Sequence, residues 1–196
     1  MPQHAAIQTP ATLLTALSPH RTLLKTLGLA VGGSLLLAVS AKVQVPFWPV
    51  PMTLQSLVVL LIGMAYGSRL AAGTVLLYLG EGLAGLPVFA GAAAGPAYFM
   101  GPTAGYLAGF VLAAYLIGLM AERGWDRSIP KAAVAMTAGH VLLFVPGVAW
   151  LAYLIGWEKA VAVGLVPFIG ATVLKTALGV AVMQAAWRVV ARRSSC

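Results

Sequence analysis

Charged residues are scarce in this chain, and acidic ones are the scarcest. Only 8% of the 196 residues are charged, whereas 61% are hydrophobic; a soluble domain carries about 25% charged residues. A chain of this composition has too few polar residues to form the water-exposed surface of a soluble domain, which excludes a soluble enzyme or a nucleotide-binding domain. The sequence predicts an all-α integral membrane protein, and at roughly 20 apolar residues per span its length allows about six to eight spans.

Motifs for catalysis, nucleotide binding and metal binding are also missing. The sequence has no G-x-S-x-G or H-E-x-x-H motif, and no Gly-Lys pair from which a phosphate-binding loop is built. We therefore predict no catalytic residues, no metal site and no cofactor, and we place an intramembrane enzyme last among the possible classes. The single cysteine, Cys196, is the final residue and cannot form a disulfide within the chain.

Six apolar runs, bounded by charges, proline or glycine, are predicted to form six transmembrane helices in one compact bundle. They cover residues 23–41, 54–68, 70–85, 103–121, 131–156 and 160–187. Only Gly67, Ser68 and Arg69 separate the second run from the third, which predicts a tight helical hairpin. The bundle is a single domain over residues 21–190, between a flexible N-terminal tail, 1–20, and a basic C-terminal tail, 191–196. A cleavable signal peptide at 21–41 is less favoured, because its basic region begins late.

The distribution of lysine and arginine predicts the orientation of the bundle. Nine of these residues lie on one side, two lie on the other (Lys42 and Lys159), and Lys175 lies inside the last run. By the positive-inside rule both termini face the cytoplasm, as in a multi-pass protein of the cytoplasmic (inner) membrane. The basic residues do not cluster on a wettable face, so the net charge of +8 does not indicate nucleic-acid binding. The nine are Arg21, Lys25, Arg69, Arg123, Arg127, Lys131, Arg188, Arg192 and Arg193.

Two apolar segments contain too many helix breakers to span the membrane as helices. Residues 42–53 carry three prolines, Pro46, Pro49 and Pro51, and residues 86–102 carry a series of glycines and prolines. Irregular backbone at membrane depth is tolerated only where protein buries it or where it lines a cavity. Both segments lie on the outer side in the six-span arrangement, and we predict that they close over a cavity.

Ionisable side chains inside a membrane protein are costly and often mark functional sites. Lys175 lies within the last run, Glu81 near the outer end of the third, and His140 midway along the fifth. Each has a plain alternative: Lys175 reaching toward the interface, Glu81 contacting interfacial water, and His140 paired within the bundle. The three lie on different helices, so only the fold can bring them together.

Small residues follow one another every four positions in the first run. Ala30, Ser34 and Ala38 share one helix face, and such a face lets another helix approach closely. The pattern predicts either a docking surface for a partner membrane protein or packing within the bundle.

Three segments resemble the signature of the BioY family, the biotin-specific substrate-binding subunits (S components) of energy-coupling factor (ECF) transporters. They are VPFWPVPMTLQ (45–55), YLGEGLAGLPVFAG (78–91) and GPTAGYLAGF (101–110), and the resemblance continues through 139–151 and 167–175. It implies a six-helix bundle that binds biotin from outside and associates with a membrane coupling (T) subunit and two ATPase subunits. Some family members work without these partners, so a stand-alone carrier for biotin or another small solute is the alternative.

The resemblance also implies a binding site on the last helix, where the family carries PF-x-x-x-D-x-x-K. Pro167, Phe168 and Lys175 match this pattern, but Thr172 stands at the aspartate position. We expect Lys175 to contact the ligand by its charge, Thr172 to assist it, and Glu81 or His140 to recognise the biotin urea, with Gln55 as a weaker polar candidate. The expected apolar walls come from Phe47, Trp48, Tyr98, Phe99, Phe144, Trp150 and Phe168.

Overall fold

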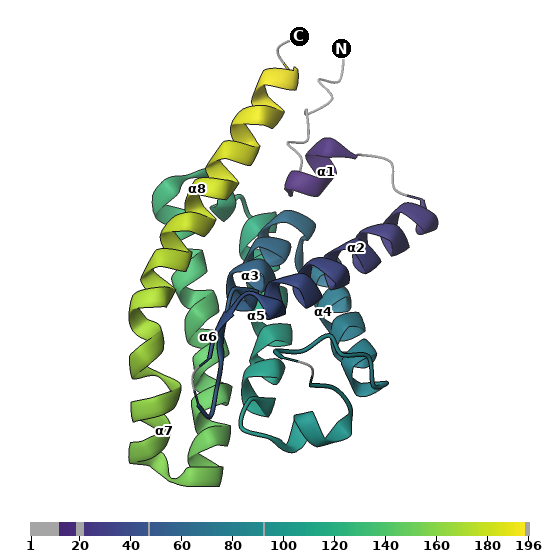
Figure 1. Cartoon of the computed structure of the whole chain (residues 1–196). Coiled ribbons are helices and arrows are strands. Elements are labelled where there is room, and N and C mark those ends of the chain that lie inside the picture. Colours follow the sequence, from purple (N-terminus) through teal and green to yellow (C-terminus); the bar gives the residue numbers. More distant parts are fainter. Residues whose placement is uncertain (1–11, 19–21, 47, 92, 195–196) are drawn as a thin grey trace, which may run out of the picture.

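The computed structural model describes residues 12–18, 22–46, 48–91 and 93–194, and nearly all regular structure in them is helical (Figure 1). A short antiparallel hairpin pairs Gln44 with Thr53 and Val45 with Met52. The elements in order are α1 (Leu13–Leu17), α2 (Leu23–Lys42), β1 (Gln44–Val45), β2 (Met52–Thr53), α3 (Gln55–Tyr66), α4 (Ser68–Leu83), η1 (Pro96–Met100), α5 (Ala104–Glu122), η2 (Trp125–Arg127), α6 (Ile129–Ile155), α7 (Trp157–Gly164), η3 (Val166–Phe168) and α8 (Ile169–Ser194).

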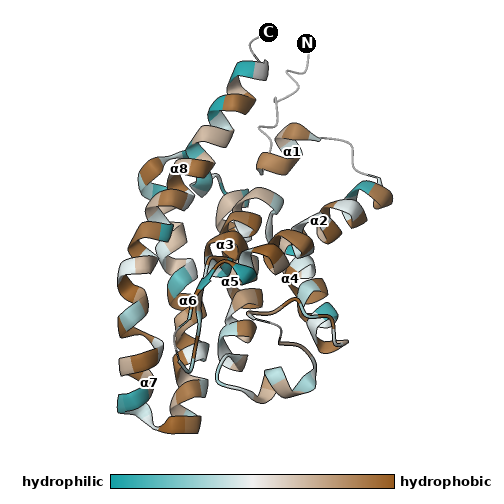
Figure 2. Ribbon diagram, viewed as in Figure 1, coloured by the Kyte–Doolittle hydropathy of each residue, from teal (hydrophilic) through white to brown (hydrophobic). Residues whose placement is uncertain are grey.

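Each of the six predicted apolar runs contains a helix, and the chain is a multi-pass membrane protein. Among the described residues, α2, α5, α6 and the continuous stretch Trp157–Arg192 are long and apolar enough to cross a membrane. Many leucine and valine side chains on α2 and α8 are exposed, for example Leu24 at 80% and Leu174 at 70%. Figure 2 shows hydrophobic residues along all the long helices. The helix α3 has 12 residues and α4 has 16, so six complete spans stay a prediction.

The predicted helical hairpin is present between α3 and α4. Gly67 has a φ of +82°, a conformation that favours glycine, and it is the single residue between the end of α3 and the start of α4. Glu122, the last residue of α5, accepts hydrogen bonds of 2.8 Å from both the backbone N–H and the hydroxyl of Ser68. These bonds satisfy a free amide at the start of α4 and join the turn to α5.

The central element of the bundle is α5, which packs against α3, α4 and α6. Glycines permit this close packing: a Cβ added at Gly118 would overlap the backbone of Ser68, and one at Gly109 would lie 2.9 Å from the Leu143 carbonyl oxygen. In Figure 1, α2 lies obliquely across α3 and α4, which it contacts, while α6 and α8 run side by side.

Three predicted boundaries differ from the structure. Within the predicted N-terminal tail, residues 13–17 form α1, because Thr12 and Thr15 make reciprocal capping hydrogen bonds and α1 contacts α3 and α8. The helix α8 continues to Ser194, well into the predicted C-terminal tail. The predicted last span divides into α7 and α8 at η3, where Pro167 lacks the N–H that a continuous helix needs.

A buried aspartate fastens α8 to the link between α5 and α6, far from the β1–β2 hairpin. Asp126 of η2 is fully buried, and its Oδ2 accepts a 2.7 Å hydrogen bond from Trp187 Nε1 of α8. Gln184 Nε2 donates to the Asp126 carbonyl oxygen at 3.1 Å. The Arg127 guanidinium carbon lies 4.7 Å from the centroid of the Trp187 ring.

Burial raises the pKa of the Asp126 carboxyl above its ordinary value of 3.8, although the Trp187 hydrogen bond opposes the shift. The folded state therefore binds this proton more tightly than the unfolded state, and the carboxyl lowers stability progressively as the pH rises through the folded pKa. We expect Asp126→Asn, whose side-chain oxygen still accepts from Trp187, to flatten the pH dependence of the unfolding temperature in detergent.

The matched variant Asp126→Ala separates this charge effect from the loss of the hydrogen bond. It leaves the Trp187 N–H without its partner, and we expect a loss of about 1–3 kcal/mol at every pH. An unchanged pH profile in Asp126→Asn would contradict the titration of this carboxyl.

Candidate functional site

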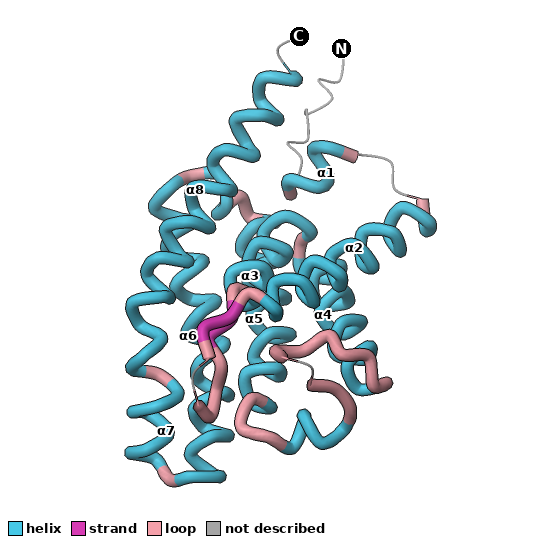
Figure 3. The backbone as a smooth tube through the Cα atoms, viewed as in Figure 1, coloured by secondary structure: helices cyan, strands magenta, loops and turns pink. Residues whose placement is uncertain are grey.

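A pocket opens beneath the two irregular segments, at the N-terminal ends of α3 and α5. It holds about 620 Å³ of empty space, including its opening. Both segments contribute to it, as predicted: the β1–β2 hairpin supplies Val50, Pro51 and Thr53, and the second segment supplies Ala90 and Tyr98. Figure 3 shows the strands of the hairpin in magenta and the loops of both segments in pink. The remaining lining residues come from helices: Gln55, Ser56, Thr103, Tyr106, Leu107, Phe110, His140, Leu143, Phe144, Phe168, Thr172 and Lys175.

Lys175 is the single cationic side chain among these lining residues. It lies in the second turn of α8, because the helix restarts at Ile169 after η3. Its Nζ donates hydrogen bonds of 2.6 Å to the Thr53 carbonyl oxygen and 2.9 Å to Ser56 Oγ. These two bonds join α8 to the hairpin and to α3, and they leave one N–H of the ammonium for a ligand.

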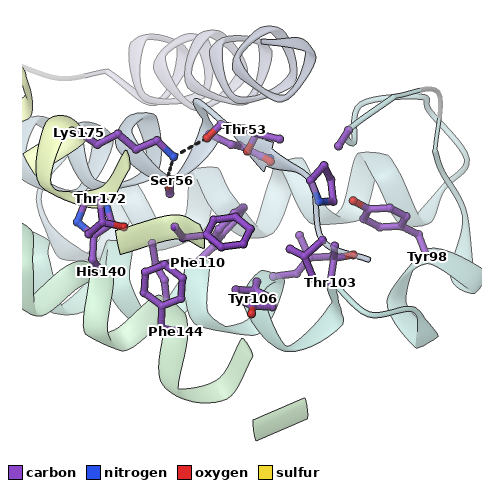
Figure 4. Close-up of a pocket in the computed structure, with 17 residues that line it drawn as sticks. Thr53, Ser56, Tyr98, Thr103, Tyr106, Phe110, His140, Phe144, Thr172 and Lys175 are labelled. Atoms are coloured by element: carbon purple, nitrogen blue, oxygen red, sulfur yellow. Dashed lines mark hydrogen bonds between the residues drawn. The ribbon is translucent and has the colours of Figure 1, made fainter. Parts of the chain in front are cut away.

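His140 of α6 lies beside Thr172 at the same end of the pocket (Figure 4). Its Nδ1 lies 3.0 Å from the Met136 carbonyl oxygen and 3.3 Å from Thr176 Oγ1. The carbonyl oxygen accepts a hydrogen bond from Nδ1–H, and in that tautomer Nε2 is an unprotonated acceptor. In the described part of the chain this Nε2 is buried without a hydrogen-bond partner, as expected of an atom reserved for a ligand N–H.

Aromatic side chains form the middle of the pocket. The ring of Phe144 packs edge-on against Tyr106 at 6.2 Å between centroids and against Phe168 at 6.0 Å. The Tyr106 hydroxyl donates a 2.7 Å hydrogen bond to the Gly164 carbonyl oxygen, which fixes the ring against α7. Figure 4 shows Lys175, Thr172 and His140 at one end, Phe110 and Phe144 in the middle, and Tyr98 at the other end. The pocket is therefore elongated, with its cation at one end.

Five of the eight predicted ligand-binding residues line the pocket: Lys175, Thr172, His140, Tyr98 and Phe168. The weaker polar candidate Gln55 and the expected wall residue Phe144 line it as well. Phe99 instead packs edge-on against Phe89 at 5.5 Å, and Phe47 lies outside the described residues.

Three predicted residues, Glu81, Trp48 and Trp150, do not line the pocket. Glu81 accepts a hydrogen bond from the Ser34 hydroxyl and therefore points toward α2. Trp48 is 86% exposed, because the hairpin presents its side chain to the surroundings. Trp150 donates a 2.9 Å hydrogen bond from Nε1 to the Gly101 carbonyl oxygen, which holds its ring outside the cavity.

The small-residue face of α2 lies within the bundle. Ser34 is fully buried and bonded to Glu81 of α4, and Ala38 packs against the hydrophobic core. Ala30 is half-buried, on the same side of the helix. Packing within the bundle matches the contacts of Ser34 and Ala38, and a docking role for Ala30, Ser34 and Ala38 stays a prediction. The exposed face of α2 is lined with large side chains such as Leu24, Leu35 and Val39.

Sequence reasoning did not single out Thr53, Ser56 or Tyr106 for the pocket. Thr53 lies inside the motif at 45–55, Ser56 follows it directly, and Tyr106 lies inside the motif at 101–110. The motifs therefore carried the signal, but only the fold tells which of their side chains face inward. In the described residues no group of three His, Cys, Asp or Glu side chains is arranged to hold a metal ion.

Known proteins with similar sequences and folds complete the assignment. The chain matches the BioY family over residues 9–192. It is 36% identical over 149 residues to a probable biotin transporter BioY of Pyrococcus horikoshii, which covers 76% of this chain and 88% of that protein. It is 34% identical over 172 residues to the biotin transporter BioY2 of Lactococcus lactis subsp. cremoris, covering 85% of this chain and 94% of that protein.

A solved structure has the same fold. A crystal structure of the S-component for biotin from an ECF-type ABC transporter superposes with a TM-score of 0.75 at 24% sequence identity, covering 86% of this chain and 95% of that chain. The match over nearly the whole sequence, together with these relatives, shows that the chain belongs to the BioY family.

Proposed function

We propose that this chain captures biotin in the pocket beneath the two irregular segments and delivers it inward across the cytoplasmic membrane. The observation that carries the proposal is the combination of an elongated aromatic cavity, a cation at one end, and an unpaired histidine nitrogen beside it. Curated relatives bearing the name biotin transporter support the same ligand.

The chemistry of biotin matches these groups one by one. Its carboxylate would accept the remaining N–H of Lys175 and a second hydrogen bond from the hydroxyl of Thr172. Thr172 stands at the position where the family usually has aspartate. Its urea, which has two N–H donors, lies at the opposite end of the molecule from the carboxylate, so in this pose the urea points toward Tyr98. The reversed pose would instead bring the urea to His140 Nε2, an acceptor without a partner at the Lys175 end. Its sulfur-containing ring would lie among Tyr106, Phe110 and Phe144.

Isothermal titration of the detergent-purified chain with biotin tests the proposal, with biotin methyl ester titrated in parallel. We expect the acid to bind, and the ester to bind about tenfold more weakly or worse, because esterification removes a charge-assisted hydrogen bond. If the protein shows a cooperative unfolding transition, yet neither compound gives a binding heat or competes for the site, biotin is not the ligand. Equal binding of acid and ester would place Lys175 away from the carboxylate.

We also propose that the chain works as the substrate-specific subunit of an ECF transporter, with both termini in the cytoplasm. The fold shared with an ECF S-component supports this assembly, and the absence of a phosphate-binding loop means that ATP hydrolysis must come from partner subunits. The family is one of transporters, which leaves the enzyme alternative without support. Uptake of labelled biotin in cells lacking the ATPase subunits distinguishes this role from a stand-alone carrier.

A further inference from the structure

Lys42, the last residue of α2, makes an unusual set of contacts with the second irregular segment. Its Nζ lies 2.6 Å from the Pro87 carbonyl oxygen, 2.7 Å from that of Phe89 and 2.6 Å from that of Gly91. A lysine ammonium has three N–H donors, and all three are used here on alternate residues of one stretch of backbone. The segment 86–91 therefore wraps around the end of this one side chain.

The segment that Lys42 holds positions two residues of the pocket. Ala90 lines the cavity directly. Phe89 is buried and stacks on the ring of Tyr98, another lining residue, with 4.5 Å between ring centroids and 10° between ring planes. A displacement of the backbone at 87–91 would therefore move Ala90 and remove the support of Tyr98.

A second tether connects the same segment to a side chain inside the pocket. The amide of Gln55, which lines the cavity, donates a 2.5 Å hydrogen bond to the Tyr78 hydroxyl. That hydroxyl in turn donates a 3.0 Å hydrogen bond to the Val88 carbonyl oxygen. The segment is thus fastened from α2 by Lys42 and from α4 by Tyr78, and Tyr78 also contacts the Phe89 ring edge-on at 5.4 Å.

We infer that Lys42 is a latch that keeps the segment 86–91 closed over the pocket and so limits the rate at which bound ligand leaves. Carbonyl groups of irregular backbone at the membrane need hydrogen-bond donors, and Lys42 supplies three of them. Lys42 does not line the cavity, so it is a positioning residue that acts through the segment. The expected effect on ligand release rests on the proposed capture of biotin. The expected opening of the ligand-free segment does not.

The kinetic test compares Lys42→Met with Lys159→Met in the purified full chain. Methionine keeps most of the apolar length of lysine and has no donor, and Lys159 is an exposed lysine of α7 that does not line the pocket. We expect release of radiolabelled biotin to be about 10- to 100-fold faster in Lys42→Met and unchanged in Lys159→Met, because several charge-assisted hydrogen bonds are lost. The association rate should rise as well, because the same hydrogen bonds hold the segment closed in the ligand-free chain. Equal release from the two variants would overturn the latch.

A ligand-free measurement keeps this result separate from the proposed function. In a Cys196→Ser background, Ala90→Cys reports the opening of the segment by its rate of reaction with a maleimide. We expect Lys42→Met to accelerate labelling and Lys159→Met to leave it unchanged, whether or not biotin binds. If biotin does not bind the native chain but Lys42→Met still accelerates labelling, the ligand is wrong and the latch stands; if labelling is not accelerated, the latch is wrong. Should Lys42→Met fail to fold, Tyr78→Phe removes the second tether alone, and it must also accelerate labelling.

Discussion

Replacement of Lys175 by methionine is expected to weaken biotin binding by about 100-fold. A hydrogen bond between charged groups contributes about 1.5–3 kcal/mol, and truncating one partner of a buried charge pair costs about 2–5 kcal/mol. Lys175 is the sole cation among the lining residues, so no neighbouring side chain can replace it at the carboxylate. Isothermal titration of the variant gives the loss directly.

Two comparisons make the Lys175 result specific. Ser56→Ala removes one protein partner of the Lys175 ammonium but keeps the charge, and we expect it to weaken binding by less than about tenfold. The methyl ester and the acid should bind Lys175→Met with the same affinity, because the variant has lost the group that distinguishes them. A persistent preference for the acid in Lys175→Met would show that another group holds the carboxylate.

The second large effect is expected at Gly105, where α5 crosses α6. A Cβ at this position would overlap the Pro146 carbonyl oxygen and would lie 2.5 Å from Trp150 Cβ and 3.0 Å from Gly147 Cα. Two of these three obstacles are backbone atoms, so the helices would have to separate. We expect Gly105→Ala to lower the free energy of unfolding by about 3 kcal/mol, the upper end of the usual cost of overpacking.

Thermal unfolding in detergent measures this loss, with Gly73→Ala as the matched control. Gly73 lies in α4, and a Cβ there would meet nothing within 4 Å. Alanine is a better helix former than glycine by about 1 kcal/mol, so the control should unfold at the same or a higher temperature. Equal unfolding temperatures for the two variants would mean that α5 and α6 adjust to the added methyl group.

The sequence predicted the helices well because the membrane limits the alternatives. Apolar runs interrupted by charge or proline must be helical, and the helices at the six runs follow that rule. The same scarcity of charge drew attention to Lys175 and His140, and both line the pocket. A polar group surrounded by apolar residues is conspicuous in a sequence even when its partners are unknown.

Other features depend on contacts between segments far apart in the chain, and no local pattern contains them. Glu81 was conspicuous for the same reason as Lys175, but its partner Ser34 lies 47 residues away and draws it out of the pocket. Lys42 counted only as a charge for orientation, although its side chain fastens backbone more than 40 residues further along. Trp48 and Trp150 were chosen for their aromatic character, which does not determine the direction in which a side chain points.

The short helix α3 bears on how far a captured molecule must travel. Its 12 residues extend about 18 Å, whereas the hydrocarbon layer of a bilayer is about 30 Å thick. In the predicted six-span arrangement the turn at Gly67, with Ser68, Arg69 and Glu122 around it, lies at one membrane surface, which puts the shortfall of about 12 Å at the end that begins with Gln55. In that arrangement a molecule in contact with Gln55 would already have passed roughly two fifths of the hydrocarbon layer, beneath the irregular segments that cover the pocket.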